Sequence, residues 1–384
     1  MIVFYSIVLN HHQAPLADAL WSLTKGEYRF VELSGSSSYQ KGGVSDYSSR
    51  PYLIQAWKDE ASYNEAWKLA KTADVCVFGG ADALYFQTER MRRGLLSFEM
   101  GERWLKKGIR NLLSPRLMKS VLMYHLGGWR NRPLYKLCAG AYVINDQYKL
   151  RTYKDKCFKW GYFTDVPDGQ ESNLAARFNS TQTLSMMWCS RFIDWKHPEL
   201  PILLAQKLKQ NGYDVVIDMY GNGEEWNASK ERIEQLGVEN VVRLHGAVAN
   251  DTVLEEMRRH DVFLFTSDQN EGWGAVANEA MSCGCVLVAS DAIGSVPYLV
   301  EDGKNGLVFH SNDVESLYDT IVRILNHREE LSGLSNNGVE TMKNVWSPRV
   351  AAERFINLAQ ALKKGEDTPY EDGPCSKANV MRYA

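Results

Sequence analysis

Short apolar runs alternate along the chain with amphipathic stretches of helical period, and this alternation constrains the fold more than any other feature. In the second half, apolar runs occupy 215–220, 262–265 and 286–289, and helical stretches such as 274–282 and 312–326 lie between such runs. Continuous apolar runs of this length are typical of strands buried on both faces of a parallel sheet. The pattern therefore predicts an α/β fold in which helices wrap parallel sheets.

The chain is long enough for two such sheets. Its 384 residues exceed what one core usually organises, so we expect two domains. In the first half, 2–9 and 74–78 read as strands, and 15–23 reads as a helix. Turn-forming residues cluster near 166–182 and indicate a hinge there. The polar, unpatterned residues 366–384 are expected to form a loose tail.

Charge and composition exclude several classes of function. The formal net charge of −3 argues against bulk nucleic-acid binding, so we expect no nucleic-acid partner. No stretch approaches the roughly 18 apolar residues of a membrane span, and the N-terminus reads as a core strand and not as a signal peptide. The seven cysteines are scattered without a metal-binding spacing. These features favour a reducing, cytoplasmic setting and no zinc site.

Two glutamates frame the segment that carries most of the functional signal. Glu271 precedes a predicted helix, and Glu279 lies inside it. The N–H groups of Gly274, Ala275 and Val276, at the start of that helix, can hold a phosphate. The two carboxylates are about 12 Å apart along a helical segment, too far for an acid–base pair on one bond. They suit a ligand with a hydroxylated group at each end of a diphosphate; alternatively, Glu271 caps the helix and Glu279 is solvated.

Two cations follow the first predicted strand of the second domain. Arg191 offers a planar fork for phosphate oxygens, and Lys196 offers a mobile point charge. Together they can neutralise a leaving diphosphate, so we expect no metal and no other cofactor to be required. The alternative is a pair of surface cations.

These residues resemble the motifs of a large family, the retaining glycosyltransferases of family 4 with the GT-B fold. Glu271 and Glu279 are similar to its E-x7-E signature, and Arg191 and Lys196 to its G-R-x4-K element, although His197 stands where glycine is usual. The resemblance implies that Glu271 contacts the donor sugar and that Glu279 contacts the ribose. It is good over roughly 183–363 and poor before that.

The resemblance also implies an architecture. Two Rossmann-like domains would face each other across a cleft. The first, over 1–170, would bind the acceptor, and the second, over 171–345, would bind the nucleotide sugar. A helix over 346–365 would cross back to the first domain, and the loose tail would occupy 366–384.

Turns in the second domain add donor-binding candidates. Gly221 ends a strand as in the G-x-G element of the family, and the place of a third glycine is taken by Trp226, which argues against a dinucleotide fingerprint. His245 and Gly246 resemble the segment in which the family places the nucleobase. A plain turn after a strand is an equal alternative there.

The first domain offers three candidates for an acceptor or phosphate loop. His11 and His12 follow the first strand, and Gly80 follows the strand at 74–78. Loops at the carboxyl ends of parallel strands are the usual place for ligands in such folds. The alternatives are a polar helix start for the histidines and a tight turn for Gly80.

A basic stretch suggests a membrane-facing surface. Between 103 and 136 there is no Asp or Glu. Apolar residues are interleaved with Arg103, Lys106, Lys107, Arg110, Arg116, Lys119, Arg130, Arg132 and Lys136. Such a face can rest on anionic lipid headgroups. An ordinary solvated face is the alternative.

The resemblance implies a hexosyltransferase-type enzyme. It would move a sugar from a nucleoside diphosphate sugar to a hydroxyl of a glycan or a lipid-linked acceptor with retention of configuration. The expected location is the cytoplasm, with the inner face of the membrane as an alternative. The predicted catalytic residues are Glu271, Arg191 and Lys196. Two alternatives stay open: a sugar-nucleotide epimerase or hydrolase of the same fold, and a non-catalytic protein that binds sugar nucleotides.

Overall fold

The chain forms two compact units, each built on its own sheet. The computed structural model describes residues 1–35, 46–80, 83–106, 108–166, 178 and 183–381. The first unit comprises Met1–Thr164 and Trp346–Met381, and the second comprises Asp165–Val345. The predicted hinge near 166–182 lies almost entirely outside the described residues.

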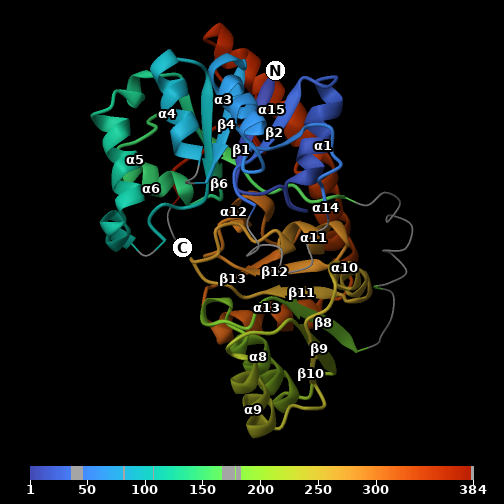
Figure 1. The fold of residues 1–384 in the computed structure, drawn as a ribbon. Coiled ribbons are helices and arrows are strands. Elements are labelled where there is room, and N and C mark those ends of the chain that lie inside the picture. The colour runs from blue at the N-terminus through green and yellow to red at the C-terminus, as the bar shows by residue number, and fades with distance from the viewer. Residues whose placement is uncertain (36–45, 81–82, 107, 167–177, 179–182, 382–384) are drawn as a thin grey trace. The chain divides into compact units, whose positions relative to one another are not determined.

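The first unit contains a seven-stranded parallel sheet in the order β3-β2-β1-β4-β5-β6-β7 (Figure 1). Most of its strands are fully or largely buried. Its strands are β1 (Ile2–Ser6), β2 (Tyr28–Glu32), β3 (Leu53–Gln55), β4 (Val75–Gly79), β5 (Ser97–Gly101), β6 (Leu134–Ala139) and β7 (Cys157–Trp160). Its earlier helices are α1 (Ala14–Leu23), α3 (Glu60–Thr72), α4 (Leu84–Arg93), η2 (Gly108–Leu113), α5 (Pro115–His125), η3 (Trp129–Asn131) and α6 (Val143–Lys149).

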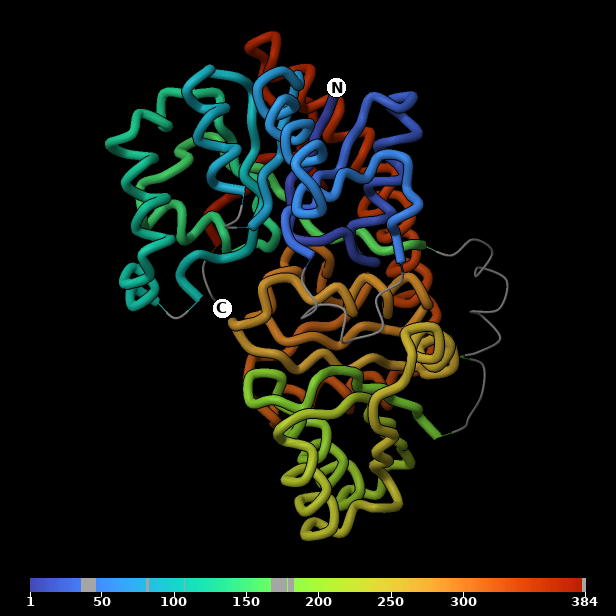
Figure 2. The backbone as a smooth tube through the Cα atoms, viewed as in Figure 1, coloured from blue at the N-terminus to red at the C-terminus, as the bar shows by residue number. Residues whose placement is uncertain are grey.

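The final helix completes the core of the first unit. Helix α15 (Pro348–Lys364) begins where the Ser347 side chain accepts from the Val350 N–H, and it ends at Gly365, whose φ is 78°. Its Phe355 ring lies 5.4 Å from Phe4 and 5.1 Å from Phe98, centroid to centroid. The red end of the chain in Figure 2 therefore runs through the part coloured blue to green.

The tail after α15 is packed, not loose as the sequence predicts. Lys377 forms an antiparallel bridge with Phe158 of β7. The side chains of Cys375 and Ser376 are fully buried. Further along, the amide of Asn145 donates to the carbonyl of Met381 at 2.7 Å. Backbone pairing to an edge strand thus orders a segment whose polar sequence carries no helical or strand period.

The second unit contains a six-stranded parallel sheet in the order β10-β9-β8-β11-β12-β13. Its strands are β8 (Leu184–Cys189), β9 (Val215–Tyr220), β10 (Val242–Gly246), β11 (Val262–Phe265), β12 (Val286–Ser290) and β13 (Leu307–Phe309). Its helices are η4 (Asp194–Lys196), α8 (Glu199–Gln210), α9 (Trp226–Leu236), α10 (Asn250–Arg259), α11 (Val276–Ser282), α12 (Val296–Leu299), α13 (Val314–Asn326) and α14 (Glu330–Asn344). Apolar residues from these strands and from α8, α13 and α14 form one continuous core.

Strand order fixes where a ligand can bind in each unit. The chain reverses direction along the sheet between β1 and β4 in the first unit, and between β8 and β11 in the second. In open parallel sheets, ligands bind beyond the carboxyl ends of the strands at such reversal points. The loops after these four strands carry His11, His12, Gly80, Arg191, Lys196 and Glu271.

Candidate functional site

Lys196 and Glu271 meet at the reversal point of the second unit. Lys196 ends the short helix η4 after β8, and its Nζ donates to Glu271 Oε2. Ser267 Oγ donates to the same carboxylate oxygen at 3.2 Å. Both charged side chains are only slightly exposed, 11% and 12%. The structure therefore brings together one residue from each of two predicted motifs.

Arg191 lies close to this pair but is exposed to solvent. Its guanidinium carbon is 5.9 Å from the centre of the Trp195 ring, and Lys196 Nζ is 4.4 Å from the same ring. An aromatic face attracts cations and limits their freedom. The ring of Trp195 thus holds both cations on one side of the edge where the carboxyl ends of the strands lie. The sequence alone does not single out this residue.

Buried hydrogen bonds anchor the loop that carries the lysine. The indole N–H of Trp188 donates to Thr266 Oγ1 at 2.9 Å, and this hydroxyl donates to the Lys196 carbonyl at 2.7 Å. The Asp268 N–H donates to the Trp195 carbonyl at 3.1 Å. The ends of β8 and β11 are therefore tied together directly beneath the charged pair.

His197 occupies the place where the family usually has glycine, and it adopts the backbone that glycine favours. Its φ is 51°, in the left-handed region. Its ring lies 2.7 Å from Glu199 Oε1 and 3.7 Å from Asp268 Oδ2. Hydrogen bonds to Asp268 and Glu199 raise the pKa of His197 to about 9. The imidazole is therefore charged at neutral pH, and its two carboxylate contacts offset the backbone strain.

Glycines let the loops of this edge pack against one another. A Cβ on Gly221, whose φ is 124°, would overlap the carbonyl oxygen of Ser190. A Cβ on Gly294 would overlap the carbonyl oxygen of Gly272. Gly274 has a φ of 76° and lies against Phe265. These contacts fix the positions of the loops on which Arg191 and Glu271 lie.

Glu279 lies within α11 and is almost fully buried. Desolvation raises the pKa of its carboxyl group to about 7, and Asn250 opposes this shift through a hydrogen bond. Helix α11 begins at Val276 with Ala275 as its N-cap residue. The predicted alternative of a solvated glutamate at 279 is therefore wrong, because the sequence did not reveal how deeply α11 is buried.

His245 is part of a chain of hydrogen-bonded groups at the end of β10. Asp218 accepts from His245 Nε2 at 2.5 Å and from His260 Nε2 at 3.0 Å. The ring of Tyr220 stacks on His245 with centroids 4.5 Å apart and planes 11° apart. Nothing lies within 4 Å of a Cβ built on Gly246, so the space beside His245 is open. Sequence reasoning missed Asp218 and Tyr220, which orient this imidazole.

The first unit has a cavity at its own reversal point. It has a volume of about 490 Å³ and is lined by His12, Gly80, Glu102 and Tyr162, among others. His11 is exposed and does not line it. Burial, and secondarily the charge of the neighbouring histidine, lowers the pKa of His12 to about 3. His12 is therefore neutral and can exchange hydrogen bonds with a ligand, but it cannot act as a cation for phosphate.

The basic stretch 103–136 divides into structural and exposed residues. Lys136 is fully buried and pairs with Glu99 at 2.7 Å, and Arg103 pairs with Asp146 at 3.1 Å. These two cations hold the first unit together and are not on a membrane-facing surface. Lys107 lies outside the described residues. The exposed cations are Arg110, Arg116, Lys119, Arg130 and Arg132.

Large apolar side chains are exposed on the same segment. They are Ile109, Leu113, Met118, Leu122 and Leu126, exposed by 48–81%. Met118, Leu122 and Leu126 are spaced four residues apart and lie along one side of α5 and its end. Among the described residues, no helix is long and apolar enough to cross a bilayer. We name the five side chains the α5 apolar patch.

Sequence comparison finds a known family that the second unit resembles. Residues 176–341 match the family model described as glycosyl transferases group 1, which covers less than half of the chain. Over these residues the chain is similar to group 1 glycosyl transferases. This match confirms the resemblance found in the sequence, although it does not test the two-glutamate motif.

Individual relatives of this domain are distant. The GtfA subunit of the UDP-N-acetylglucosamine–peptide N-acetylglucosaminyltransferase of Streptococcus gordonii is 24% identical over 209 residues, covering 53% of this chain and 40% of that protein. The poly(glycerol-phosphate) alpha-glucosyltransferase of Bacillus subtilis is 32% identical over 147 residues, covering 38% of this chain and 21% of that protein. The chain spans less than half the length of these curated relatives.

A solved structure resembles the fold over nearly the whole chain. HepE from Anabaena, in complex with UDP, has a TM-score of 0.69 and 16% sequence identity, covering 94% of this chain and 99% of that one. At this identity the likeness concerns the fold alone. It confirms the predicted α/β fold with two parallel sheets, the GT-B fold of glycosyltransferases.

Proposed function

We propose that this protein is a retaining glycosyltransferase that moves a sugar from a nucleoside diphosphate sugar to a hydroxyl of a glycan or lipid-linked acceptor. The observation that carries the proposal is the Lys196–Glu271 pair beside Arg191 at the reversal point of a domain similar to group 1 glycosyl transferases. The names of the relatives support a sugar donor, since several are UDP-N-acetylglucosamine or glucosyl transferases. The UDP in HepE supports a uridine nucleotide as the first donor to test.

The geometry suggests how the donor would be held. Without a ligand, Lys196 and Glu271 neutralise each other. A bound donor would give Lys196 a diphosphate oxygen and Glu271 the sugar hydroxyls, so the pair would separate without leaving a buried charge unpaired. Arg191 and the N–H groups of Gly274 to Val276, which lead into α11, would add positive charge on the diphosphate side.

The remaining donor contacts follow from the same edge. Glu279 would accept from the ribose hydroxyls, and the open space beside His245 and Gly246 would take the base. Gly221 lets the loop before them pack closely. Two cations suffice to stabilise the leaving diphosphate, so we propose that no metal is required. Activity that is unchanged by EDTA supports this point, and activity that is lost with EDTA and restored by Mg²⁺ contradicts it.

Product analysis with a panel of UDP, GDP and ADP sugars separates the proposal from its alternatives. Transfer to an added glycan or lipid-linked acceptor, with the α-linked product from an α-linked donor, supports a retaining transferase. Isomerised or hydrolysed sugar nucleotide without transfer favours the epimerase or hydrolase. Binding without turnover favours the non-catalytic protein.

A matched pair of variants tests the site. Glu271→Gln removes the charge that we assign to the donor sugar and should lower transfer by about 100-fold or more, as for other groups that act on transition-state charge. Glu234→Gln removes an exposed charge on α9 of the same unit and should leave transfer unchanged. Full activity of Glu271→Gln would contradict the proposed mechanism.

We also propose that the enzyme works at a membrane surface on the cytoplasmic side, through the α5 apolar patch. The patch lies among Arg110, Arg116 and Lys119, and each basic residue near an anionic surface contributes about 1 kcal/mol of attraction. Apolar side chains that enter the headgroup region add to this attraction. A lipid-linked acceptor would be reached most directly from such a position.

Vesicle cosedimentation tests the membrane proposal. The protein should bind vesicles that contain phosphatidylglycerol and not vesicles of phosphatidylcholine alone. A variant with Leu113, Leu122 and Leu126 replaced by Gln should lose binding. A control with Trp57 and Tyr85 replaced by Gln, which are exposed elsewhere in the same unit, should keep it. Equal binding of both variants would refute the assignment of this patch.

A further inference from the structure

We propose that the first unit carries a separate carbohydrate site between α6, β7 and the tail, and that this site binds a glycan bearing a carboxylate, a uronic acid. The site is a cavity of about 720 Å³, a size typical of sites for small molecules. It is lined by residues from α6, from the loop that joins α6 to β7 and from the tail residues 377–380. We name it the α6 cavity.

The α6 cavity lies away from the predicted acceptor site of the same unit. The cavity that contains His12 is lined by Ala139, the last residue of β6. The α6 cavity is lined by Cys157, the first residue of β7, which runs parallel to β6. The two cavities therefore lie at opposite edges of one sheet. The proposal accordingly goes beyond the transfer reaction and does not depend on it.

A buried amide gives the first indication of a ligand. Gln147 lines the α6 cavity and its side chain is fully buried. Its Oε1 accepts from Thr152 Oγ1 at 2.7 Å, but its Nε2 makes no hydrogen bond with any described residue. A buried donor without an acceptor is unusual in a folded protein. A hydroxyl, ring or carboxylate oxygen of a glycan would supply the acceptor.

Backbone strain gives a second, independent indication. Arg151, Tyr153 and Asp155 all line the cavity, and their φ values of 53°, 50° and 60° lie in the left-handed region. The Tyr153 hydroxyl donates to Glu99, and the Asp155 carbonyl accepts from Lys377. The exposed side chain of Arg151 forms no ion pair or hydrogen bond with any described residue. Strain of this kind is concentrated at ligand sites, and a ligand at Arg151 would account for it.

The apolar and polar groups around the cavity suit a sugar. Tyr148 and Val380 line it and are 71% and 51% exposed, so an aromatic ring is available to a ligand. Aromatic faces pack against the C–H face of a sugar ring. Amide and carboxylate groups of Gln147, Asn379 and Asp155 line the same cavity. A hydroxyl both donates and accepts, so a mixture of donors and acceptors favours a polyol.

The charges of the cavity indicate one acidic group on that sugar. Lys377 pairs with Asp367 at 2.8 Å. The other charged groups that line the cavity are Arg151, Lys154 and Asp155, and none of them forms an ion pair with a described residue. Their sum is one positive charge. It suits one carboxylate, which the fork of an arginine binds through two parallel hydrogen bonds, better than the several charges of a nucleotide.

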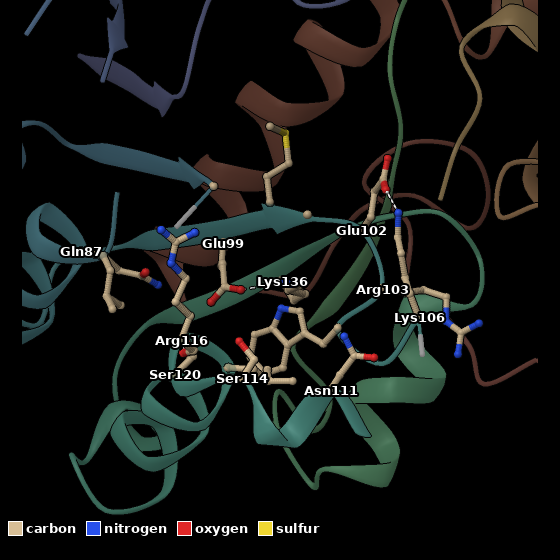
Figure 3. A pocket seen from close by; sticks show the side chains of 16 residues that line it. Gln87, Glu99, Glu102, Arg103, Lys106, Asn111, Ser114, Arg116, Ser120 and Lys136 are labelled. Atoms are coloured by element: carbon tan, nitrogen blue, oxygen red, sulfur yellow. Dashed lines mark hydrogen bonds and ion pairs between the residues drawn. The ribbon is translucent and has the colours of Figure 1, made fainter. Parts of the chain in front are cut away.

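Another cavity of the unit shows the contrast. Figure 3 shows the cavity of about 450 Å³ at the carboxyl ends of β4 and β5, where Lys106 pairs with Glu102 at 2.5 Å and Lys136 pairs with Glu99 at 2.7 Å. An anion that binds to these two lysines would have to displace a carboxylate. In the α6 cavity, an anion can bind to Arg151 without breaking an ion pair, and this lowers the cost of binding.

A titration of the full chain with two tetrasaccharides tests the proposal. The probes are a hyaluronan tetrasaccharide, which contains glucuronic acid, and chitotetraose, which is neutral, and ligand-observed NMR gives each dissociation constant. The hyaluronan tetrasaccharide should bind at least about tenfold more tightly, because only it offers a carboxylate to Arg151. Equal affinity for the two probes, or no saturable binding of hyaluronan up to roughly 10 mM, would overturn the proposal.

A matched pair of glycine variants locates the binding. Arg151→Gly should weaken hyaluronan binding at least about tenfold, and relief of the strained backbone should raise the melting temperature by about 2–4 °C. Lys25→Gly removes another exposed cation of the first unit, with a φ of 52°, and should raise the melting temperature similarly without changing binding. Equal hyaluronan binding by the two variants would reject Arg151 as the recognition residue.

Two tyrosine variants and one glutamine variant complete the test. Tyr148→Ala should weaken hyaluronan binding by about 3- to 10-fold, whereas Tyr85→Ala, which changes a tyrosine 62% exposed on α4, should not. Gln147→Met removes the donor and should weaken binding by a similar factor. If all three variants bind like the wild type, the glycan binds elsewhere and the site is rejected. These titrations contain no UDP, so a negative result leaves the proposed donor site standing.

Discussion

Replacing His197 by asparagine should remove a pH-dependent part of the stability of the second unit. Asparagine tolerates positive φ better than most residues, so the backbone with φ of 51° is kept while the charge is lost. In the native protein, the contacts with Asp268 and Glu199 raise the pKa of His197 to about 9, from 6.5 in a free side chain. The imidazolium is therefore bound more tightly by the folded state than by the unfolded state.

The size and the pH range of the effect follow from this shift. A rise from 6.5 to about 9 corresponds to about 3.4 kcal/mol if nothing screens the contacts. Because the ring is partly exposed to solvent, which screens its contacts, we expect about 1–2 kcal/mol. Because the pKa of His197 is raised in the folded protein, its contacts contribute their full stabilisation of the folded state below pH 6.5. The contribution is lost as the pH rises through 9.

Urea titration at pH 6 to 10 measures the effect, with hydrogen exchange of the β8 and β11 peptides reporting on the second unit separately. The wild-type protein should exceed His197→Asn by about 1–2 kcal/mol at pH 6 and should match it near pH 10. His310→Asn, which changes a histidine that is 71% exposed, is the control and should show a much smaller difference. A difference that stays constant with pH, or no difference at pH 6, would refute the reasoning.

Three other predictions concern groups in each unit. Because the pKa of Glu279 is about 7, UDP affinity measured by calorimetry should fall up to about tenfold per pH unit below 7, and Glu279→Gln should lose this dependence. If the affinity of the wild-type protein and that of the variant depend equally on pH, the ribose contact is contradicted. Arg90→Met should lower the free energy of unfolding of the first unit by about 3 kcal/mol or more in urea titration, because the buried guanidinium donates to three backbone carbonyls; a loss below 1 kcal/mol would be inconsistent with that network. Gly294→Ala should displace the Glu271 loop and abolish UDP binding. Gly333→Ala, where the added methyl meets open space within a helix, should preserve UDP binding and raise the free energy of unfolding by about 0.5–1 kcal/mol. Equal UDP binding by both variants would show that the loop tolerates the change.

The second sheet was readable from the sequence because its strands are covered on both faces. Apolar runs at 215–220, 262–265 and 286–289 correspond to β9, β11 and β12, and the helix predicted at 274–282 corresponds to α11. Such strands need no tertiary information to be recognised, since nearly every side chain is apolar. The first sheet was harder. Strands β5 and β6 contain Glu99 and Lys136, a charged pair whose burial only the fold reveals.

Local composition misled in two further places. The residues from Arg103 to Lys136 carry no acidic side chain, so the stretch read as one basic face. Its first and last cations pair instead with Asp146 and Glu99, which lie elsewhere in the sequence. The tail after 365 has no period, and its order comes from pairing with the edge strand β7. Neither contact leaves a signal within the segment itself.

In the second unit, the sequence identifies the motif residues but not the residues that contact them. Lys196 and Glu271 stood out by their spacing, and the structure brings them together. Trp195 and Asp268 did not, because a single aromatic or acidic residue in a loop has no pattern. The departure from the family at His197 was a usable signal. A non-glycine residue at a position that favours positive φ calls for compensating contacts, and the nearby carboxylates provide them.

The division of the first unit into two stretches of chain has a consequence for biosynthesis. Phe4 and Phe98 are made early, but Phe355, which packs against both, is made only after the whole second unit. At about 5–20 residues per second, the 181 residues from Asp165 to Val345 delay it by about 10–35 s. During that time the nascent first sheet has an uncovered apolar face. A chaperone that binds such surfaces would therefore be needed early in translation, while the intervening domain can fold as soon as it leaves the ribosome.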